Sequence, residues 1–351
     1  MKDSPLVSIV TPFYNTADYL AECIESVLRQ TYANWEYILL NNQSNDGSAE
    51  IAASYAQRFP DKVRVFQTAT FLSQVQNYNH ALSLIAPEGK YCKMVQADDW
   101  LFPECIERMV ELAESHPKVG IVAAYELEGK WVSIDGLPYP SPEVPGRDVC
   151  RLFFLENLSL FGSPTSLLMR SDVVRSRTPF YEERHAPFED SHACFDVLES
   201  WNYGLVHQVL TYSRRDNDSF LLRMRPYRFG LFSRLAKILA HGKKYLSADE
   251  YSYFLRDAEH KYFMFLGRSA LQGRDAKFWA FHRERLGSIG YSLDAAFMAK
   301  WIGLVVLDYA GNPKRTLEYL WPRRKRLWSV TARFFRTMRG AFHGRKKAEQ
   351  S

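Results

Sequence analysis

Short apolar runs alternate with amphipathic segments along the first 130 residues. The runs are rich in Val, Ile and aromatic residues, which favour strands; they lie at 7–11, 35–40, 63–67, 91–96 and 119–125. Between the first two runs, apolar side chains recur at helical spacing at Leu20, Cys23, Ile24, Val27 and Leu28. Further helices are predicted at 48–58, 74–86 and 103–115. This alternation predicts an α/β fold with a mostly parallel, Rossmann-like sheet flanked by helices.

The pattern changes after residue 125. Pro and Gly are frequent from 126 to 150, which predicts a surface loop. Apolar runs at 163–169 and 204–212 and a helix over 190–201 are expected to complete the domain. From about 220 the pattern is helical and aromatic. We therefore predict an α/β domain at 1–220, a C-terminal helical extension at 221–312 and a basic tail at 313–351.

Composition and charge narrow the class of protein. The 351 residues are 46% hydrophobic, enough for a substantial core. Residues 313–351 hold 12 Lys and Arg against 2 Asp and Glu, a net charge of +10, which leaves −5 for the rest of a chain whose total is +5. Because the positive charge is confined to one end and accompanies no nucleic-acid-binding motif, we expect no nucleic-acid partner.

The cysteines and the N-terminal sequence indicate the cellular compartment of the protein. Five scattered cysteines include no C-x-x-C pair, which argues against a disulfide framework and a zinc site. No secretion signal or membrane span is visible in the sequence. We expect a cytoplasmic protein.

The segment QADDW, residues 96–100, ends an apolar run on two adjacent carboxylates. Asp98 and Asp99 repel each other unless a cation lies between them, and hard oxygen ligands at the mouth of an α/β sheet suit Mg²⁺ or Mn²⁺. The alternative is that one Asp caps the next helix and the other is solvated.

Four stretches together resemble the family-two glycosyltransferases of GT-A fold. In chain order they are VSIVTPFYN, SVLRQTYANWEYILLNNQSNDGS, GKYCKMVQADDWLFP and FEDSHACFDVLESW. The resemblance covers roughly residues 5–220. It implies a metal-dependent inverting enzyme that moves a hexosyl or N-acetylhexosaminyl group from a nucleotide-sugar donor, with a UDP-sugar expected. The implied acceptor is a saccharide or lipid-linked glycan in cell-surface polysaccharide biosynthesis.

The resemblance also implies roles for individual residues. The donor-binding positions are Thr11, Pro12, Tyr14, Asn15, Asn42, Asn77, Asn79, Gln96, Asp98 and Arg215. Asp98 and Asp99 match the metal-binding motif, with Mn²⁺ or Mg²⁺ as cofactor. Asp190 matches the catalytic base, with Glu189 as second choice.

Two departures from the family pattern affect the donor site. Asn41 and Asn42 replace a frequent Asp pair, yet an amide carbonyl can accept the same hydrogen bond from a nucleobase. Gln96 replaces a frequent Asp and is a poor cation ligand, so Asp98 and Asp99 must carry the metal.

Local structural roles remain as alternatives for the other positions. NNQSNDGS (41–48) also fits a tight turn, and Asp190 could cap the following helix. Asn77 and Asn79 could be exposed amides at a helix start, and Arg215 an ordinary ion pair. Asp216, which stands where relatives have a His, fits a metal ligand or a partner of an Arg.

The tail segment 321–347 is amphipathic when wound as a helix, with basic residues beside its apolar stripe. This predicts contact with an anionic membrane surface, on the inner face of the cell membrane. The alternative is packing on the protein itself or on a subunit partner.

Two other functions are compatible with parts of the pattern. A catalytically silent nucleotide-sugar or glycan-binding module is favoured by Gln96 and the Asn pair, whereas the retained acidic pairs argue against it. A nucleotidyltransferase would need a Gly-rich loop after the first strand, and TPFYNT has no Gly.

Overall fold

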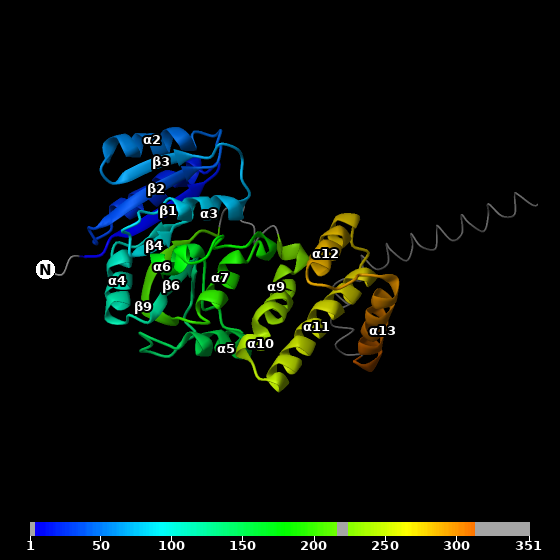
Figure 1. The fold of residues 1–351 in the computed structure, drawn as a ribbon. Coiled ribbons are helices and arrows are strands. Elements are labelled where there is room, and N and C mark those ends of the chain that lie inside the picture. Colours follow the sequence, from blue (N-terminus) through cyan, green and yellow to red (C-terminus); the bar gives the residue numbers. More distant parts are fainter. Residues whose placement is uncertain (1–3, 216–223, 313–351) are drawn as a thin grey trace, which may run out of the picture. The chain divides into compact units, whose positions relative to one another are not determined.

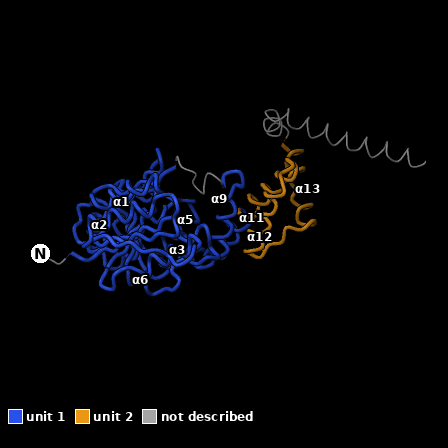
Figure 2. Tube along the Cα trace, turned by 90° about the horizontal axis from the view of Figure 1, so that it is seen from above, with its two compact units in different colours: residues 1–257 blue, residues 258–351 orange. Residues whose placement is uncertain are grey.

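The structure is a computed structural model that describes residues 4–215 and 224–312. The chain divides into two compact units, residues 1–257 and 258–351 (Figure 2). The first unit extends past residue 220, where the sequence predicts a domain boundary; that boundary stays a prediction. The tail and Asp216 lie outside the described residues.

A nine-stranded sheet organises the first unit, in the order β3-β2-β1-β4-β8-β6-β9-β5, with β7 paired to β6 (Figure 1). The strands are β1 (Val7–Phe13), β2 (Trp35–Asn41), β3 (Val63–Gln67), β4 (Tyr91–Met94), β5 (Trp100–Leu101), β6 (Val119–Glu128), β7 (Trp131–Ser133), β8 (Leu167–Arg170) and β9 (Asn202–Ser213). From β3 to β4 the strands are parallel, as are β6 and β9, whereas β8 runs antiparallel to both of its neighbours. The predicted α/β class is confirmed.

Among the described residues, ten α-helices belong wholly or in part to the first unit. They are α1 (Ala17–Leu28), α2 (Ser48–Arg58), α3 (Gln74–Ser83), α4 (Cys105–Ser115), α5 (Gly146–Glu156), α6 (Ser171–Arg175), α7 (Glu189–Val197), α9 (Phe229–Lys237) and the short α10 (Lys243–Tyr245), followed by α11 (Ala248–Leu271). Those up to α7 surround the sheet (Figure 1). The helices predicted at 48–58, 74–86 and 103–115 are confirmed to within a few residues at their ends.

The loop predicted at 126–150 is wrong in part. β6 continues to Glu128, and Gly129, with φ +59°, turns the chain back into the hairpin strand β7. The helix α5 then begins at Gly146, and its Val149, Cys150 and Phe154 are fully buried at helical spacing. The Pro-rich composition concealed both elements.

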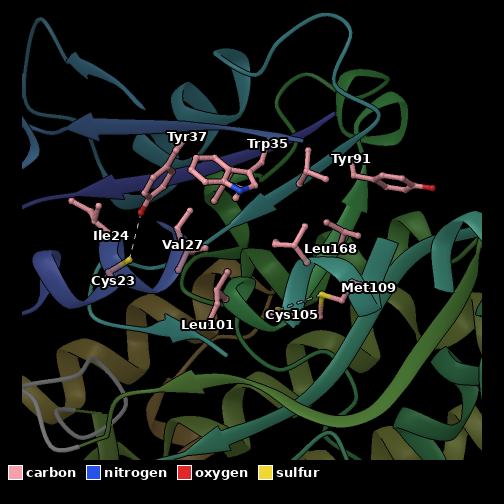
Figure 3. Close-up of a cluster of buried hydrophobic side chains, with 14 of the residues drawn as sticks. Cys23, Ile24, Val27, Trp35, Tyr37, Tyr91, Leu101, Cys105, Met109 and Leu168 are labelled. Carbon is pink, nitrogen blue, oxygen red and sulfur yellow. Dashed lines mark hydrogen bonds between the residues drawn. The ribbon is translucent and has the colours of Figure 1, made fainter. Parts of the chain in front are cut away.

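The core between the sheet and the helices α1 and α4 fixes the strand ends. Cys23 and Val27 of α1 and Met109 of α4 pack against Tyr37 of β2 and Leu168 of β8 (Figure 3). Because this cluster is buried throughout, it holds β1, β2 and β4 in register, so that their carboxyl ends form one rigid edge.

The described part of the second unit is helical. It contains the end of α11, then α12 (Ala276–Ser288) and α13 (Ala295–Gly311). Its core includes Tyr262, whose hydroxyl lies 2.7 Å from His282 Nδ1. In the part of the chain that the structure describes, every helix is too short or too polar to cross a membrane.

Candidate active site

A cavity of about 880 Å³ lies beside the carboxyl ends of β1 and β4. Ligands of parallel α/β sheets bind at this edge. The residues predicted from the sequence that line it are Pro12, Tyr14, Asn15, Asn42, Asn77, Gln96, Asp98, Asp99, Glu189, Asp190 and Arg215. The two that do not line it are Thr11 and Asn79.

Thr11 and Asn79 have partners inside the protein. Thr11 is fully buried, and its hydroxyl lies 2.9 Å from the Tyr37 hydroxyl. The Asn79 side chain donates to the Tyr181 carbonyl at 2.8 Å and accepts from the Tyr181 N–H at 2.9 Å. Thr11 is therefore part of the core, and Asn79 lines a separate hollow together with Tyr181.

The loop after β2 is tied to the loop after β1. Asn15 Oδ1 accepts from the backbone N–H of Asn45 at 2.9 Å, and the Asn15 N–H donates to Ser44 Oγ at 3.1 Å. Asp46 Oδ2 accepts from the backbone N–H of Ala17 at 2.9 Å. The segment NNQSNDGS thus forms a turn, as its composition alone suggests, and this turn fixes the rim of the cavity.

Of the three amides that stand where the family pattern has carboxylates, the two that line the cavity, Asn42 and Gln96, are held by protein partners. The Asn42 side chain donates to the Leu72 carbonyl and accepts from the Leu72 N–H, both at 2.9 Å. Gln96 Nε2 donates to the Tyr78 hydroxyl at 3.0 Å. These hydrogen bonds fix both amide side chains before any ligand binds. A contact between Asn42 and a nucleobase stays a prediction.

Asn77 offers an acceptor that the protein does not use. Its side chain lines the cavity and is 4% exposed, and Oδ1 is buried without a hydrogen-bond partner among the described residues. A buried polar atom in a native protein normally has a partner. A ligand hydroxyl or N–H would satisfy this one.

The adjacent aspartates have different surroundings. Asp99 is buried; its Oδ2 accepts from Thr165 Oγ1 at 2.7 Å and Ser213 Oγ at 3.1 Å, and its Oδ1 accepts from the Arg214 N–H at 3.0 Å. Burial, and then the charge of Asp98, raise the pKa of Asp99 to about 8. Asp98 is only partly buried. Asp98 therefore offers its carboxylate to the cavity more readily than Asp99.

These carboxylates fit a divalent cation shared with a ligand. Among the described residues, no three His, Cys, Asp or Glu side chains cluster as a metal site. At phosphate-binding sites, however, Mg²⁺ is commonly held by only one or two carboxylates, and phosphate oxygens of the ligand complete its coordination. Asp98 would supply the first protein oxygen and Asp99 at most one more, since Oδ2 of Asp99 already accepts two hydrogen bonds.

A second acidic pair lies at the start of α7. Glu189 is 4% exposed, its Oε2 has no partner within the described chain, and burial followed by the charge of Asp190 raises its pKa to about 7. Asp190 accepts from the Ser191 N–H at 2.6 Å. Burial raises the pKa of Asp190, and the positive charge of Lys237 opposes that rise.

Arg215 lines the cavity in an ion pair. Its Nη2 lies 3.0 Å from Oε2 of Glu128, which also lines the cavity. Arg214 donates from Nε to the carbonyl of Asp98 at 3.1 Å and stands 4.6 Å from the Tyr19 ring. Arg215 therefore forms an ion pair, as the alternative interpretation of the sequence predicts. To contact a phosphate, its guanidinium would have to separate from Glu128.

Sequence reasoning missed Lys237, the last residue of α9. It lines the cavity at 8% exposure, and its Nζ lies 4.6 Å from the ring centroid of Phe188. Burial lowers its pKa to about 8, with the charge of Asp190 opposing the decrease. A lysine inside the apolar run FGLFSRLAKILA was the available signal.

Comparison with known sequences gives a family match. Residues 8–175 match the profile of the family described as Glycosyl transferase family 2. The chain is 28% identical over 235 residues to EpsE of Bacillus subtilis, a protein that carries a glycosyltransferase name. That alignment covers 65% of this chain and 79% of EpsE.

Comparison with solved structures gives the same fold. TarS of S. aureus, solved in complex with UDP-GlcNAc, matches 90% of this chain and 91% of its own with a TM-score of 0.60 at 15% identity. The mannosyltransferase PcManGT of Pyrobaculum calidifontis, solved with GDP-Man and Mn²⁺, matches 88% of both chains with a TM-score of 0.51 at 14% identity. At these identities the likeness shows the fold.

Proposed function

The chain belongs to glycosyl transferase family 2 through residues 8–175, and from this premise we propose that it is a metal-dependent inverting enzyme. Its donor is a nucleotide-diphosphate sugar, with a UDP-linked hexose or N-acetylhexosamine expected. Its acceptor is a saccharide or a lipid-linked glycan, and its product contributes to cell-surface polysaccharide.

One observation carries the proposal. Asp98, from the turn after β4, and Asp190, from the start of α7, line the same cavity although 92 positions separate them in the sequence. An inverting transfer needs an anchor for the leaving diphosphate and a base for the acceptor within one site, and these residues supply both.

Asp190 is the base. It takes the proton of the acceptor hydroxyl while the oxygen attacks the anomeric carbon, opposite the leaving nucleoside diphosphate. Lys237 supports this role because its positive charge favours the ionised carboxylate. Burial and the charge of Asp190 raise the pKa of Glu189 to about 7, so a large fraction of Glu189 keeps its proton near neutral pH and Asp190 is the carboxyl assigned as the base.

The donor lies on the side of Asp98 and Tyr14. A bound divalent cation supplies charge neutralisation at the departing diphosphate. Asp98 holds that cation, and Arg215 contributes a further positive charge. Tyr14 and Phe71, which form an edge-to-face pair with ring centroids 4.9 Å apart, leave exposed aromatic surface on which a nucleobase can stack.

The solved complexes of similar fold support a nucleotide-sugar donor. TarS binds UDP-GlcNAc and PcManGT binds GDP-Man with Mn²⁺. They differ in nucleobase and sugar, so the choice of a UDP-sugar rests on the family resemblance.

The proposal includes an anionic membrane surface as a partner, at the inner face of the cell membrane. The 313–351 segment carries a net charge of +10, and each basic residue near an anionic bilayer contributes about 1 kcal/mol. A lipid-linked acceptor is presented at such a surface.

A catalytically silent nucleotide-sugar or glycan-binding module is the second candidate. The internal hydrogen bonds of Asn42 and Gln96 favour it, because neither amide depends on a ligand for its position.

Donor turnover separates the two candidates. The protein is incubated with UDP-glucose, UDP-galactose, UDP-GlcNAc or GDP-mannose, with Mn²⁺ or with EDTA, and the released nucleoside diphosphate is measured. We expect slow, Mn²⁺-dependent hydrolysis of at least one donor. Binding of a donor without turnover, with membrane extract added as a source of acceptor, would favour the silent module.

A further inference from the structure

A smaller hollow of about 220 Å³ opens beside the cavity, on the side of Asp190. It shares Ser159, Gly162, Ser191 and Lys237 with the larger cavity. Ser191 follows Asp190 directly, whereas Tyr14 and Asp98 line only the larger cavity. This acceptor-side chamber, as we name it, therefore begins where the proposed base lies and extends away from the donor side.

The walls of the acceptor-side chamber come from α5, the segment after it, and α9. Phe153 and Phe161 stack in parallel with centroids 5.4 Å apart, and both line the chamber. Apolar and aromatic walls with a few fixed polar groups are typical of small-molecule sites. Such walls suit a sugar ring, which has one face of C–H bonds.

Two cations from one face of α9 line the chamber. Arg234 donates to Asn157 Oδ1 at 2.6 Å and to the Phe154 carbonyl at 3.2 Å, which fixes its guanidinium at the wall. Lys237 lies one turn further along α9. Of the described residues that line the chamber, none is acidic; the carboxylates that act on the two cations, Asp190 on Lys237 and Asp257 on Arg234, lie outside its wall.

Lys237 lacks a close partner among the described residues. Within the described part of the chain its ammonium makes no hydrogen bond or ion pair; its neighbours are the rings of Phe188 and Phe153, at 4.6 and 5.4 Å, and the charge of Asp190 acts on it through space. A desolvated charge is costly unless an opposite charge meets it. An anion in the chamber would supply that charge.

We propose that the acceptor-side chamber binds the acceptor sugar and selects one that carries a negative charge, a carboxylate or a phosphate, next to the attacking hydroxyl. This inference rests on the proposed glycosyl transfer. An anion beside Asp190 would by itself hinder ionisation of the base, and the ammonium of Lys237 offsets that effect because it faces both. A neutral sugar would leave the ammonium of Lys237 desolvated without a close anionic partner.

Binding of simple sugars tests the inference. With UDP and Mg²⁺ filling the donor side, dissociation constants of D-glucuronate, glucose 6-phosphate and D-glucose are measured by saturation-transfer NMR. We expect at least one anion to bind about tenfold more tightly than glucose, the effect of one favourable charge contact. A preference for glucuronate assigns a uronic acid acceptor, and a preference for the phosphate assigns a phosphorylated sugar.

Substitutions of Lys237 and Arg234 test whether the anion binds in the acceptor-side chamber. In Lys237→Met and in Arg234→Met the preference should fall to within about twofold, and in Lys237→Arg, which keeps the charge, it should remain. Lys243→Met is the matched control, because Lys243 is exposed on α10 and its substitution removes the same charge. This variant should keep the full preference for the anion. Thermal unfolding of each variant verifies folding, and Lys237→Met is decisive if Arg234→Met does not fold.

Three results would overturn the inference: equal affinity for glucose and both anions, saturable binding of none of them, or a preference that survives both Met variants. Donor hydrolysis by the wild-type protein is measured in parallel. Hydrolysis without any anion preference removes this inference alone, whereas failure to bind UDP or to turn over any donor removes the proposed function as well.

Discussion

The hydroxyl of Thr165 donates a 2.7 Å hydrogen bond to Oδ2 of Asp99, and the same oxygen of Thr165 accepts the backbone N–H of Gln96 at 3.0 Å. One side chain thus holds both ends of the acidic turn. Thr165 is itself fixed from behind, since the buried ammonium of Lys93 donates to its carbonyl at 2.6 Å. The position of Asp98 therefore depends on a residue that does not line the cavity.

Replacing this hydroxyl tests the dependence. Thr165→Val removes the donor to Asp99 and leaves the Gln96 N–H unpaired, so we expect a loss of about 2 kcal/mol in the free energy of unfolding. The pKa of Asp99 should rise further, because this hydrogen bond opposes the effects of burial and of the Asp98 charge. Guanidinium unfolding measures the first effect. Thr165→Ser, which keeps the hydroxyl, is the control, and an equal loss in Val and Ser would show that only packing matters.

The unequal surroundings of the two aspartates predict unequal roles in metal binding. Asp98→Asn should weaken Mn²⁺ binding in the presence of UDP by tenfold or more, with little change in stability. Asp99→Asn should weaken Mn²⁺ binding less, because both oxygens of Asp99 already accept hydrogen bonds from the protein. The signal of free Mn²⁺ in electron paramagnetic resonance gives the affinity. The reverse assignment would mean that the turn reorganises around the ion.

Strand positions were predictable because a strand buried on both faces must be apolar along its length. The run at 35–40 became β2 almost to the residue, and the run at 63–67, in which only Val63 is buried, became the edge strand β3. The antiparallel insertion of β8 between β4 and β6 could not be predicted, since a short apolar run fits either direction.

The site was predictable in its residue types and less so in their environments. A motif places Asp98 and Asp190 near a ligand, but it does not show that Asn42 is engaged by Leu72. Lys237 escaped because helical periodicity identifies the buried face of α9 without indicating what that face meets. The local sequence pattern predicts helices and strands, whereas the contacts between residues distant along the chain depend on tertiary packing.

The base assignment predicts a rate effect without a binding effect. Asp190→Asn keeps the shape of the side chain and the hydrogen bond from Ser191 but cannot take a proton, so transfer and donor hydrolysis should fall by about 10²- to 10⁴-fold. Donor affinity, measured by calorimetry with UDP and Mn²⁺, should stay within about threefold. Equal losses in rate and affinity would indicate that Asp190 only supports the helix start.

The charge of the tail predicts binding to anionic lipid. The full chain should sediment with vesicles that contain 30% phosphatidylglycerol and should be released by salt, whereas deletion of 321–351 should abolish sedimentation. Neutral phosphatidylcholine vesicles are the control for the lipid charge. Unchanged sedimentation of the truncated protein would assign the tail to the alternative of packing on protein.

The burial of Glu189 predicts a stability that depends on pH. Its pKa is about 7 in the folded protein and near the ordinary value of 4.5 when unfolded, so the folded state binds the proton more tightly. The stabilising effect of that proton is complete below pH 4.5 and is lost as pH rises through 7. Glu189→Gln mimics the protonated form at every pH. We therefore expect this variant to match the wild type at pH 4.5 and to be more stable by about 2 kcal/mol at pH 8, in urea unfolding without ligands.

Glu88→Gln is the matched control for this pH effect, because Glu88 is exposed and the substitution removes the same charge. It should change stability by less than about 0.5 kcal/mol at either pH. A gain for Glu189→Gln that is equal at pH 4.5 and pH 8 would show that the substitution acts through packing. A loss at pH 8 would show that the ionised Glu189 has a favourable partner, and the division of labour between Glu189 and Asp190 would then have to be reversed.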